Sequence, residues 1–370
     1  MLPTPNPDKP PAGPRALLAV VLGLTAAVCL MLLAFAAPAL NSGPHDLPLA
    51  VSGPEAAVQQ LRDTLTERDP GAFALTTYTD PEAVAEAIEA RAAIGGISFT
   101  DAGTIVQTAS AAGSPYAGLL KTVGAGLEAD GLPVTYIDVV PLPAGDPAGS
   151  GISALALPLA FGGMASAAVL VTLFNRSRAL RVTGAMVFSA LAGIAATAVL
   201  HGMGALGGMF WPTAAGVGLG IAAISLTVLG LESLLGFAGL GIGGLAMVFI
   251  ANPLSGVATG PDWLPRPRGA IGQSLPIGAA GTVIRSAAFF DCAGSGRSVL
   301  VLLGWIALGL ILVALSARRA ARTGNADTTT AHSPAQQSPA HAPGGGESGR
   351  SAAVEAAPAD DREEPAPQPA

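Results

Sequence analysis

Charged side chains are scarce in this chain. Of its 370 residues, 12% are charged and 51% are hydrophobic, whereas a soluble domain carries about 25% charged residues. Most of the chain is therefore not a soluble domain. Its only lysines are Lys9 and Lys121, and it has no basic patch interleaved with aromatic residues. We therefore expect no nucleic-acid binding.

Catalytic and cofactor motifs are missing as well. A Walker A loop needs Gly-Lys-Ser/Thr, but Lys9 is followed by Pro10 and Lys121 is preceded by Leu120. No G-x-S-x-G motif and no His/Asp/Glu grouping with metal-ligand spacing occurs. A G-x-G-x-x-G pattern at 239–244 lies inside an apolar run, with no soluble strand before it. We expect no enzyme and no cofactor.

The chain has two cysteines. Cys29 lies midway along an apolar run and Cys292 lies in a polar-flanked loop, so we expect them at different depths and without a disulfide. The residues before Cys29 do not match a lipoprotein signal.

Long apolar runs are abundant, and each has about the length that crosses a bilayer. The runs cover residues 16–38, 152–174, 182–200, 212–231, 234–251 and 298–316. Ala34-Phe35-Ala36 resembles a signal-peptide cleavage site, but the first apolar core exceeds the roughly 7–15 residues of a signal. We favour a retained anchor and predict a polytopic α-helical membrane protein with six transmembrane helices.

The arginines orient these helices, because cytoplasmic loops carry an excess of positive charge. With six spans, every basic cluster falls on one side, and the prediction is a multi-pass plasma-membrane protein with both termini cytoplasmic. The N-terminus covers residues 1–15, and residues 318–370, rich in Ala, Pro, Gly, Ser and Thr, are expected to form a disordered cytoplasmic tail. The clusters are Lys9 and Arg15; Arg176, Arg178 and Arg181; and Arg318, Arg319 and Arg322.

Residues 41–150 have the composition of a water-exposed domain. Strands are expected at 47–51, 72–77, 96–99, 104–109 and 134–140, and helices at 55–68, 81–92 and 115–128. Asp80-Pro81-Glu82 supplies a helix N-cap, a proline at the first helical position and an acidic first turn. The alternation of strands and helices predicts an extracytoplasmic α/β domain with some parallel pairing, inserted between helices one and two.

Residues 252–297, on the outer side, are apolar but too interrupted by proline to span a bilayer. Interfacial or re-entrant helices fit this loop, and an ordinary folded loop packing on the extracytoplasmic domain is the alternative. The notable positions are Asn252, Pro253, Gly256, Pro276, Gly278 and Arg285.

Two further sets of residues are candidate contact sites. Gly216/Gly220 and Gly239/Gly243 have the spacing that lets helix backbones approach closely, either in static packing within the bundle or in a dimer seam. Glu232, between spans four and five, is either a solvated turn residue or a contact for a cytoplasmic partner. The basic turn of Arg176, Arg178 and Arg181 is the second candidate for such a contact.

The layout of one span, a domain and five spans resembles the ABC-2-type permease superfamily, in its YhgE/Pip-like (phage infection protein-like) branch of actinobacterial membrane proteins. The resemblance covers about residues 15–320. It rests on Leu47-Pro-Leu-Ala-Val51, Asp80, Ala90-Arg91-Ala-Ala-Ile94, Asp138-Val-Val-Pro141, Asn252-Pro-Leu-Ser-Gly256, Leu275-Pro-Ile-Gly-Ala279 and Phe289-Phe290-Asp291.

That resemblance implies an exporter-like half that moves a hydrophobic or amphipathic substrate. It would work as a homodimer in the lipid bilayer with a separate ATPase subunit. The alternative is a non-transporting surface receptor or assembly scaffold that binds through the extracytoplasmic domain.

Overall fold

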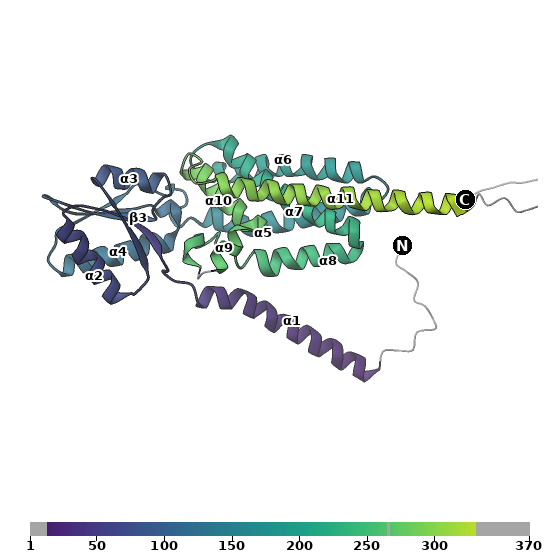
Figure 1. Ribbon diagram of the computed structural model, residues 1–370, viewed down its shortest axis with the longest axis horizontal. Coiled ribbons are helices and arrows are strands. Elements are labelled where there is room, and N and C mark those ends of the chain that lie inside the picture. Colours follow the sequence, from purple (N-terminus) through teal and green to yellow (C-terminus); the bar gives the residue numbers. More distant parts are fainter. Residues whose placement is uncertain (1–12, 265–266, 331–370) are drawn as a thin grey trace, which may run out of the picture. The chain divides into compact units, whose positions relative to one another are not determined.

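The computed structural model describes residues 13–264 and 267–330. The described chain is mostly helical and contains one five-stranded sheet (Figure 1). Residues up to Arg322 form one unit by their contacts, and Thr323 begins a second. Everything described below lies in the first unit, except the last residues of the final helix.

The sheet has the strand order β2-β1-β3-β4-β5, and we call residues 47–138 the sheet domain. The pairs β1–β2, β1–β3 and β4–β5 are parallel, while β3–β4 is an antiparallel hairpin. The strands are β1 (Leu47–Ser52), β2 (Phe73–Tyr78), β3 (Gly95–Thr100), β4 (Gly103–Thr108) and β5 (Val134–Asp138). Every strand predicted for this domain is present, although β5 ends before the expected Val140.

Helices cover both faces of the sheet: α2 (Glu55–Arg68) and α4 (Ser114–Ala129) on one, α3 (Pro81–Glu89) on the other (Figure 1). Successive strand residues point to opposite faces. Thus Leu49 and Val51 pack in the same core as α2 and α4, while Ala50 packs with α3. Asp80 caps α3 by accepting a hydrogen bond from the Ala83 N–H, at 2.7 Å. The three predicted helices and the predicted cap are confirmed.

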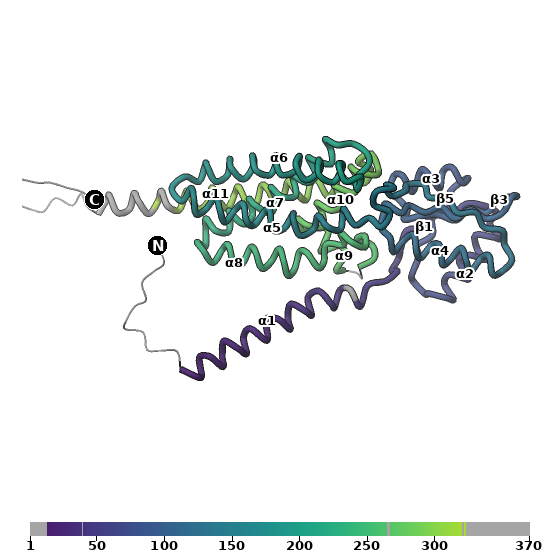
Figure 2. The backbone as a smooth tube through the Cα atoms, turned by 180° about the vertical axis from the view of Figure 1, so that it is seen from behind, coloured from purple at the N-terminus to yellow at the C-terminus, as the bar shows by residue number. Residues whose placement is uncertain are grey.

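Among the described residues, five helices are long and apolar enough to cross a membrane. They are α1 (Pro14–Leu40), α5 (Ser150–Leu173), α6 (Arg178–Gly202), α7 (Phe210–Leu235) and α11 (Gly296–Thr330). Of the 18-residue apolar stretch of α7, 83% is buried, whereas none of the corresponding stretch of α1 is. Helix α7 is therefore the centre of the bundle, whereas α1 stands apart from it (Figure 2) and Pro38 is the one buried residue among its described side chains.

The predicted span 234–251 is shorter than expected. Gly236, at φ +64°, ends α7, so that α8 begins only at Phe237 and runs to Ala246. A π-helical turn, η2 (Met247–Ala251), continues it. These 10 and 5 residues span about 22 Å at 1.5 Å per residue, less than the roughly 30 Å of a hydrocarbon core.

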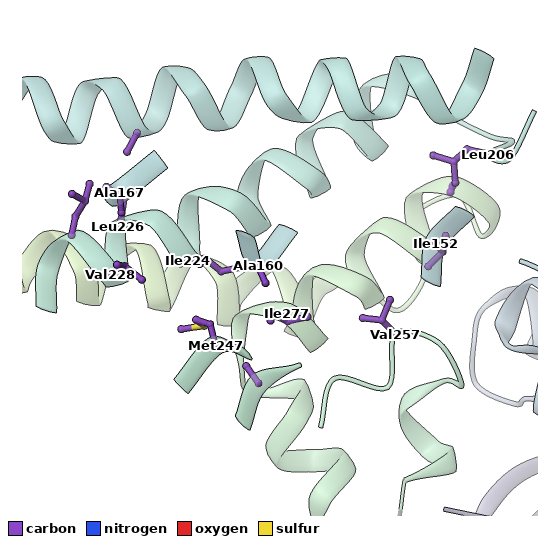
Figure 3. Packing of buried hydrophobic residues seen from close by; sticks show 14 residues of the cluster. Ile152, Ala160, Ala167, Leu206, Ile224, Leu226, Val228, Met247, Val257 and Ile277 are labelled. Atoms are coloured by element: carbon purple, nitrogen blue, oxygen red, sulfur yellow. The ribbon is translucent and has the colours of Figure 1, made fainter. Parts of the chain in front are cut away.

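The described residues between 252 and 295 form η3 (Pro261–Trp263), α9 (Arg268–Gln273) and α10 (Pro276–Phe289). Helix α10 packs on α7 and α5 and is buried along most of its length. Figure 3 shows the result from close by: Ile277 of α10 and Val257 share one apolar cluster with Ile152 of α5, Ile224 of α7 and Met247.

Polar contacts mark the two ends of the bundle. The Ser316 hydroxyl of α11 donates to the Ser233 carbonyl at 2.5 Å, and Arg178 donates to the Ser316 hydroxyl at 3.3 Å. The α5–α6 turn, the end of α7 and the end of the apolar part of α11 therefore meet at one end. The sheet domain and α9–α10 meet at the other, which we call the domain end.

Two predicted boundaries are wrong. Helix α1 begins at Pro14 and continues through Pro38 to Leu40. Helix α11 continues past Ser316 to Thr330, and the Ala and Arg residues at 317–322 favour the first part of this extension. The predicted tail therefore does not begin at 318. Residues 1–12 and 331–370 lie outside the described part of the chain.

Candidate functional site

The sheet domain is joined to residues 252–295 by buried polar contacts, and Tyr116 of α4 makes the first. Its hydroxyl accepts a hydrogen bond from the Asp262 N–H at 3.0 Å. Its ring packs edge-on against Trp263, with 5.8 Å between ring centroids. Gly260 leaves room for this, since a Cβ there would clash with the phenol. Burial raises the pKa of the Tyr116 phenol above its ordinary value.

Arg91, just after α3, makes the second contact. It adopts a left-handed backbone conformation (φ 59°), which is unfavourable for a residue with a Cβ. Its guanidinium donates to the Ser286 hydroxyl at 2.5 Å and to the Thr282 carbonyl at 3.4 Å, both on α10. It also lies over the ring of Phe290, 5.2 Å from the centroid. Arg91 thus clamps the sheet domain to α10.

Arg285 of α10 lies close to this clamp and is 5% exposed. It donates one hydrogen bond to the Val257 carbonyl, at 2.8 Å, and its Nε has no partner among the described residues. A cavity of about 10 Å³ beside it is also lined by Asp146 and Ser110. That volume is about the minimum for one water molecule. Asp146 itself caps α5, accepting from the N–H groups of Ser150 and Gly151 at 2.8 and 2.6 Å.

A larger cavity of about 860 Å³, the junction groove, lies beside the clamp. Its walls come from α3, the chain after β5, the α6–α7 loop and the end of α10. Phe289, Phe290 and Val140 give it apolar surface, and Glu86, Glu89 and Asp291 are exposed around it. Within the described part of the chain, none of these three carboxylates has a basic group at ion-pair distance. Apolar walls with unneutralised carboxylates suit an amphipathic cation.

The charged residues singled out in the sequence lie at the other end of the bundle. Arg181 and Glu232 form an ion pair at 2.8 Å, with side chains only 10% and 13% exposed. Arg181 also donates to the carbonyls of Phe174 and Asn175, at 2.9 and 2.7 Å. Both charged groups therefore satisfy each other within the chain, and Glu232 is not a solvated turn residue.

The other members of the basic turn are exposed. Arg178 bonds the Ser316 hydroxyl, and Arg176 projects from the α5–α6 turn. Arg176 is thus the member of the predicted contact set that is exposed and has no side-chain hydrogen bond or ion pair within the described chain.

The paired glycines face neighbouring helices of the same chain. A Cβ at Gly220 would lie 2.6 Å from the Ala280 Cβ, and one at Gly216 would lie 3.0 Å from Val283, both on α10. Gly239 and Gly243 face α7, where a Cβ on Gly239 would lie 2.2 Å from the Leu231 carbonyl oxygen. These surfaces are occupied by packing within the chain.

The loop residues singled out in the sequence shape the α9–α10 region. The Asn252 carbonyl accepts the Ser255 hydroxyl after Pro253, and Gly256 turns the chain at φ +63°. Pro276 opens α10, and Gly278 permits a close approach to Gly272, whose carbonyl oxygen would lie 2.3 Å from a Cβ. Of these six residues, Arg285 is the one that lies close to the buried polar contacts between the sheet domain and α10.

Sequence reasoning missed Arg91 and Tyr116 as site residues: Arg91 was noted only within a segment that carries the family resemblance, and Tyr116 lies in no recognisable motif. Among the described residues no group of three or more His, Cys, Asp or Glu side chains is placed to bind a metal, and Cys29 and Cys292 are free thiols. No protein-family model matches the chain, and no curated protein sequence or solved structure is significantly similar to it.

Proposed function

We propose that the chain is a plasma-membrane protein that resembles an ABC-2-type export permease and moves a hydrophobic or amphipathic substrate with a separate ATPase. The observation that carries the proposal is α10, which is buried against the central helix α7 and clamped to the sheet domain by Arg91. A rigid helix with contacts on both sides couples a domain outside the bilayer to helices inside it. This coupling is what an energy-driven permease with an external domain requires.

The proposal includes six crossings, with α8 and its π-helical turn as a short fifth one. Ser233, just before α8, lies at the end of the bundle opposite the sheet domain. Gly294, just before α11, lies beside Arg91 at the domain end. A Cβ added to Gly294 would be 3.4 Å from the Arg91 Cβ. The chain between them therefore traverses the bundle, and α8 is the segment that does so. A local thinning of the bilayer accommodates its short length.

Six crossings put both termini in the cytoplasm and the sheet domain outside, in agreement with the arginine distribution. Single cysteines at Gly118, exposed on α4, and Arg322, near the end of the apolar part of α11, test this in a background without Cys29 and Cys292. A membrane-impermeant maleimide should label position 118 on intact cells and position 322 only after permeabilisation. Labelling of position 322 on intact cells would refute an even number of crossings.

The ATPase would contact the α5–α6 turn at Arg176. The Arg181–Glu232 ion pair connects this turn to the end of α7. A displacement of the turn by the ATPase would therefore move the end of α7. We expect purified chain to stimulate an ATPase encoded beside it, and Arg176→Glu to abolish that stimulation. The matched control is Arg297→Glu, an exposed arginine at the domain end. Stimulation by Arg176→Glu equal to that by the control would refute the contact at Arg176, and no stimulation by the unmodified chain would refute ATP coupling.

The junction groove favours a second candidate, a surface receptor or scaffold that binds through the extracytoplasmic domain. Its exposed carboxylates and aromatic floor are placed to hold a cationic amphipathic partner. Deleting residues 45–148 should then abolish capture of that partner while leaving the helical bundle folded. Partner capture by the deleted form would refute a binding role for the domain.

A further inference from the structure

A second groove lies on the side of the bundle, between α6 and α7. Its volume is about 350 Å³. Small residues form its floor, among them Ala190 of α6 and Ala215 and Gly218 of α7. The floor is low because the two helices approach closely: a Cβ at Gly218 would lie 3.1 Å from the Ser189 carbonyl oxygen.

The walls of this groove are large apolar side chains. Met186 and Ile194 of α6 and Trp211 of α7 are 44%, 39% and 69% exposed. No titratable residue lines the groove, and the Ser189 hydroxyl in it is already bonded to the Ala185 carbonyl at 2.7 Å. The groove therefore offers an occupant apolar contact and no polar group that needs a partner.

We propose that this α6–α7 groove binds one acyl chain of a phospholipid from the leaflet on the sheet-domain side of the membrane. The proposal requires only that α6 and α7 lie in a bilayer, as their length and composition indicate, and does not depend on transport.

The dimensions of the groove fit this occupant. From Trp211 to Ala222 the groove follows about 17 Å of helix axis, close to the roughly 15 Å thickness of half a hydrocarbon core. An acyl chain of one leaflet extends over this same thickness, so one chain can lie along the whole groove.

The position of Trp211 also fits. It lies in the first turn of α7, just beyond Gly208, which contacts the end of α10 at the domain end. An exposed tryptophan at this depth is typical of the interface between acyl chains and headgroups. The lipid headgroup would therefore lie beside Trp211, and the chain would run down the groove toward Met186, near the middle of the bilayer.

Native mass spectrometry of the full chain, purified in a mild detergent, tests the proposal by counting retained phospholipids. Ala215→Phe fills the groove from α7, and Ala190→Phe fills it from α6. Ala165→Phe is the matched control, because Ala165 is an exposed alanine on α5 outside the groove. We expect the unmodified chain and the control to retain one phospholipid that both groove variants lose, with at least a tenfold drop in occupancy. Thermal melting of each variant checks that it is folded.

Fluorescence quenching locates the lipid in the same preparation. The fluorescence of Trp211 is the difference in emission between the unmodified chain and Trp211→Phe. Phosphatidylcholine with two bromine atoms near the middle of one acyl chain should quench this fluorescence. Ala190→Phe should reduce this quenching.

Two results would overturn the proposal. One is equal lipid retention by the unmodified chain and both groove variants. The other is a groove variant that converts a dimer to a monomer without losing lipid, since the groove would then be a protein contact.

Discussion

Removing Glu232 should strongly destabilise the bundle, because it leaves the Arg181 charge without a counter-ion. The two charged atoms are 2.8 Å apart and the side chains are about nine-tenths buried. At an effective dielectric constant of about 20, this separation corresponds to about 6 kcal/mol of attraction, most of which offsets the desolvation of the two ions. Breaking a buried pair by removing one partner costs about 3–5 kcal/mol.

The pair lies at the end of the bundle, where water reaches part of it, so we expect the lower end of that range, about 3 kcal/mol, for Glu232→Ala. Arg181→Met should cost a similar amount, since it also removes the bonds to the Phe174 and Asn175 carbonyls. The double variant should be more stable than the sum of the two losses predicts, because neither charge remains buried alone.

The assay is unfolding of the detergent-solubilised chain, followed by helical circular dichroism, for the four members of this double-mutant cycle. Arg176→Met, which removes an exposed arginine from the same turn, is the control and should change stability by less than about 0.5 kcal/mol. A loss below about 1 kcal/mol for Glu232→Ala would refute the reasoning. It would also return Glu232 to the role of a free contact residue.

Three further predictions concern the domain end and the packing of α7. Arg91→Ala and Ser286→Ala should show a coupling free energy of about 1.5–3 kcal/mol in a double-mutant cycle of unfolding measurements, because a hydrogen bond to a charged group contributes about that much. Additive losses of stability would contradict the clamp. Gly220→Val should destabilise the bundle by about 3 kcal/mol, because its Cβ would overlap Ala280, whereas Gly162→Val has open space and should change stability by less than about 1 kcal/mol in the same assay. Burial raises the pKa of Tyr116 above 10.0, so the folded chain keeps a proton that the unfolded chain loses. Stability should therefore fall above pH 10 by up to about 1.4 kcal/mol per pH unit, and melting of Tyr116→Phe between pH 9 and 11 should show a smaller slope.

The sheet domain could be predicted closely from the sequence. Its strands and helices are short and separated by Gly, Pro and Asp, and a single cap such as Asp80 is a local signal that determines where a helix begins. The apolar helices were predictable for a similar reason, since length and composition identify a span without reference to its neighbours. The order of the strands was not predictable, because it depends on contacts between distant segments.

The candidate site was predicted only in part. The sequence marked Arg285 through its proline-rich surroundings, but it did not indicate Arg91, which is 195 residues from its hydrogen-bond partner Ser286. It predicted Arg181 and Glu232 on the same side of the membrane, with contact to a cytoplasmic partner as a candidate role for both and a solvated turn as the alternative for Glu232. The structure instead pairs them with each other.

The sequence by itself determined the apolar helices and the sheet domain between the first two of them. These properties follow from the local balance of apolar and charged residues, which sets the solvent each segment prefers. The tertiary structure decided that Gly236 shortens the fifth apolar run, that the glycine pairs are filled by helices of the same chain, and that Arg91 clamps the domain to α10. Each of these depends on which distant segments pack together, because close approach and ion pairing are properties of two surfaces and not of one.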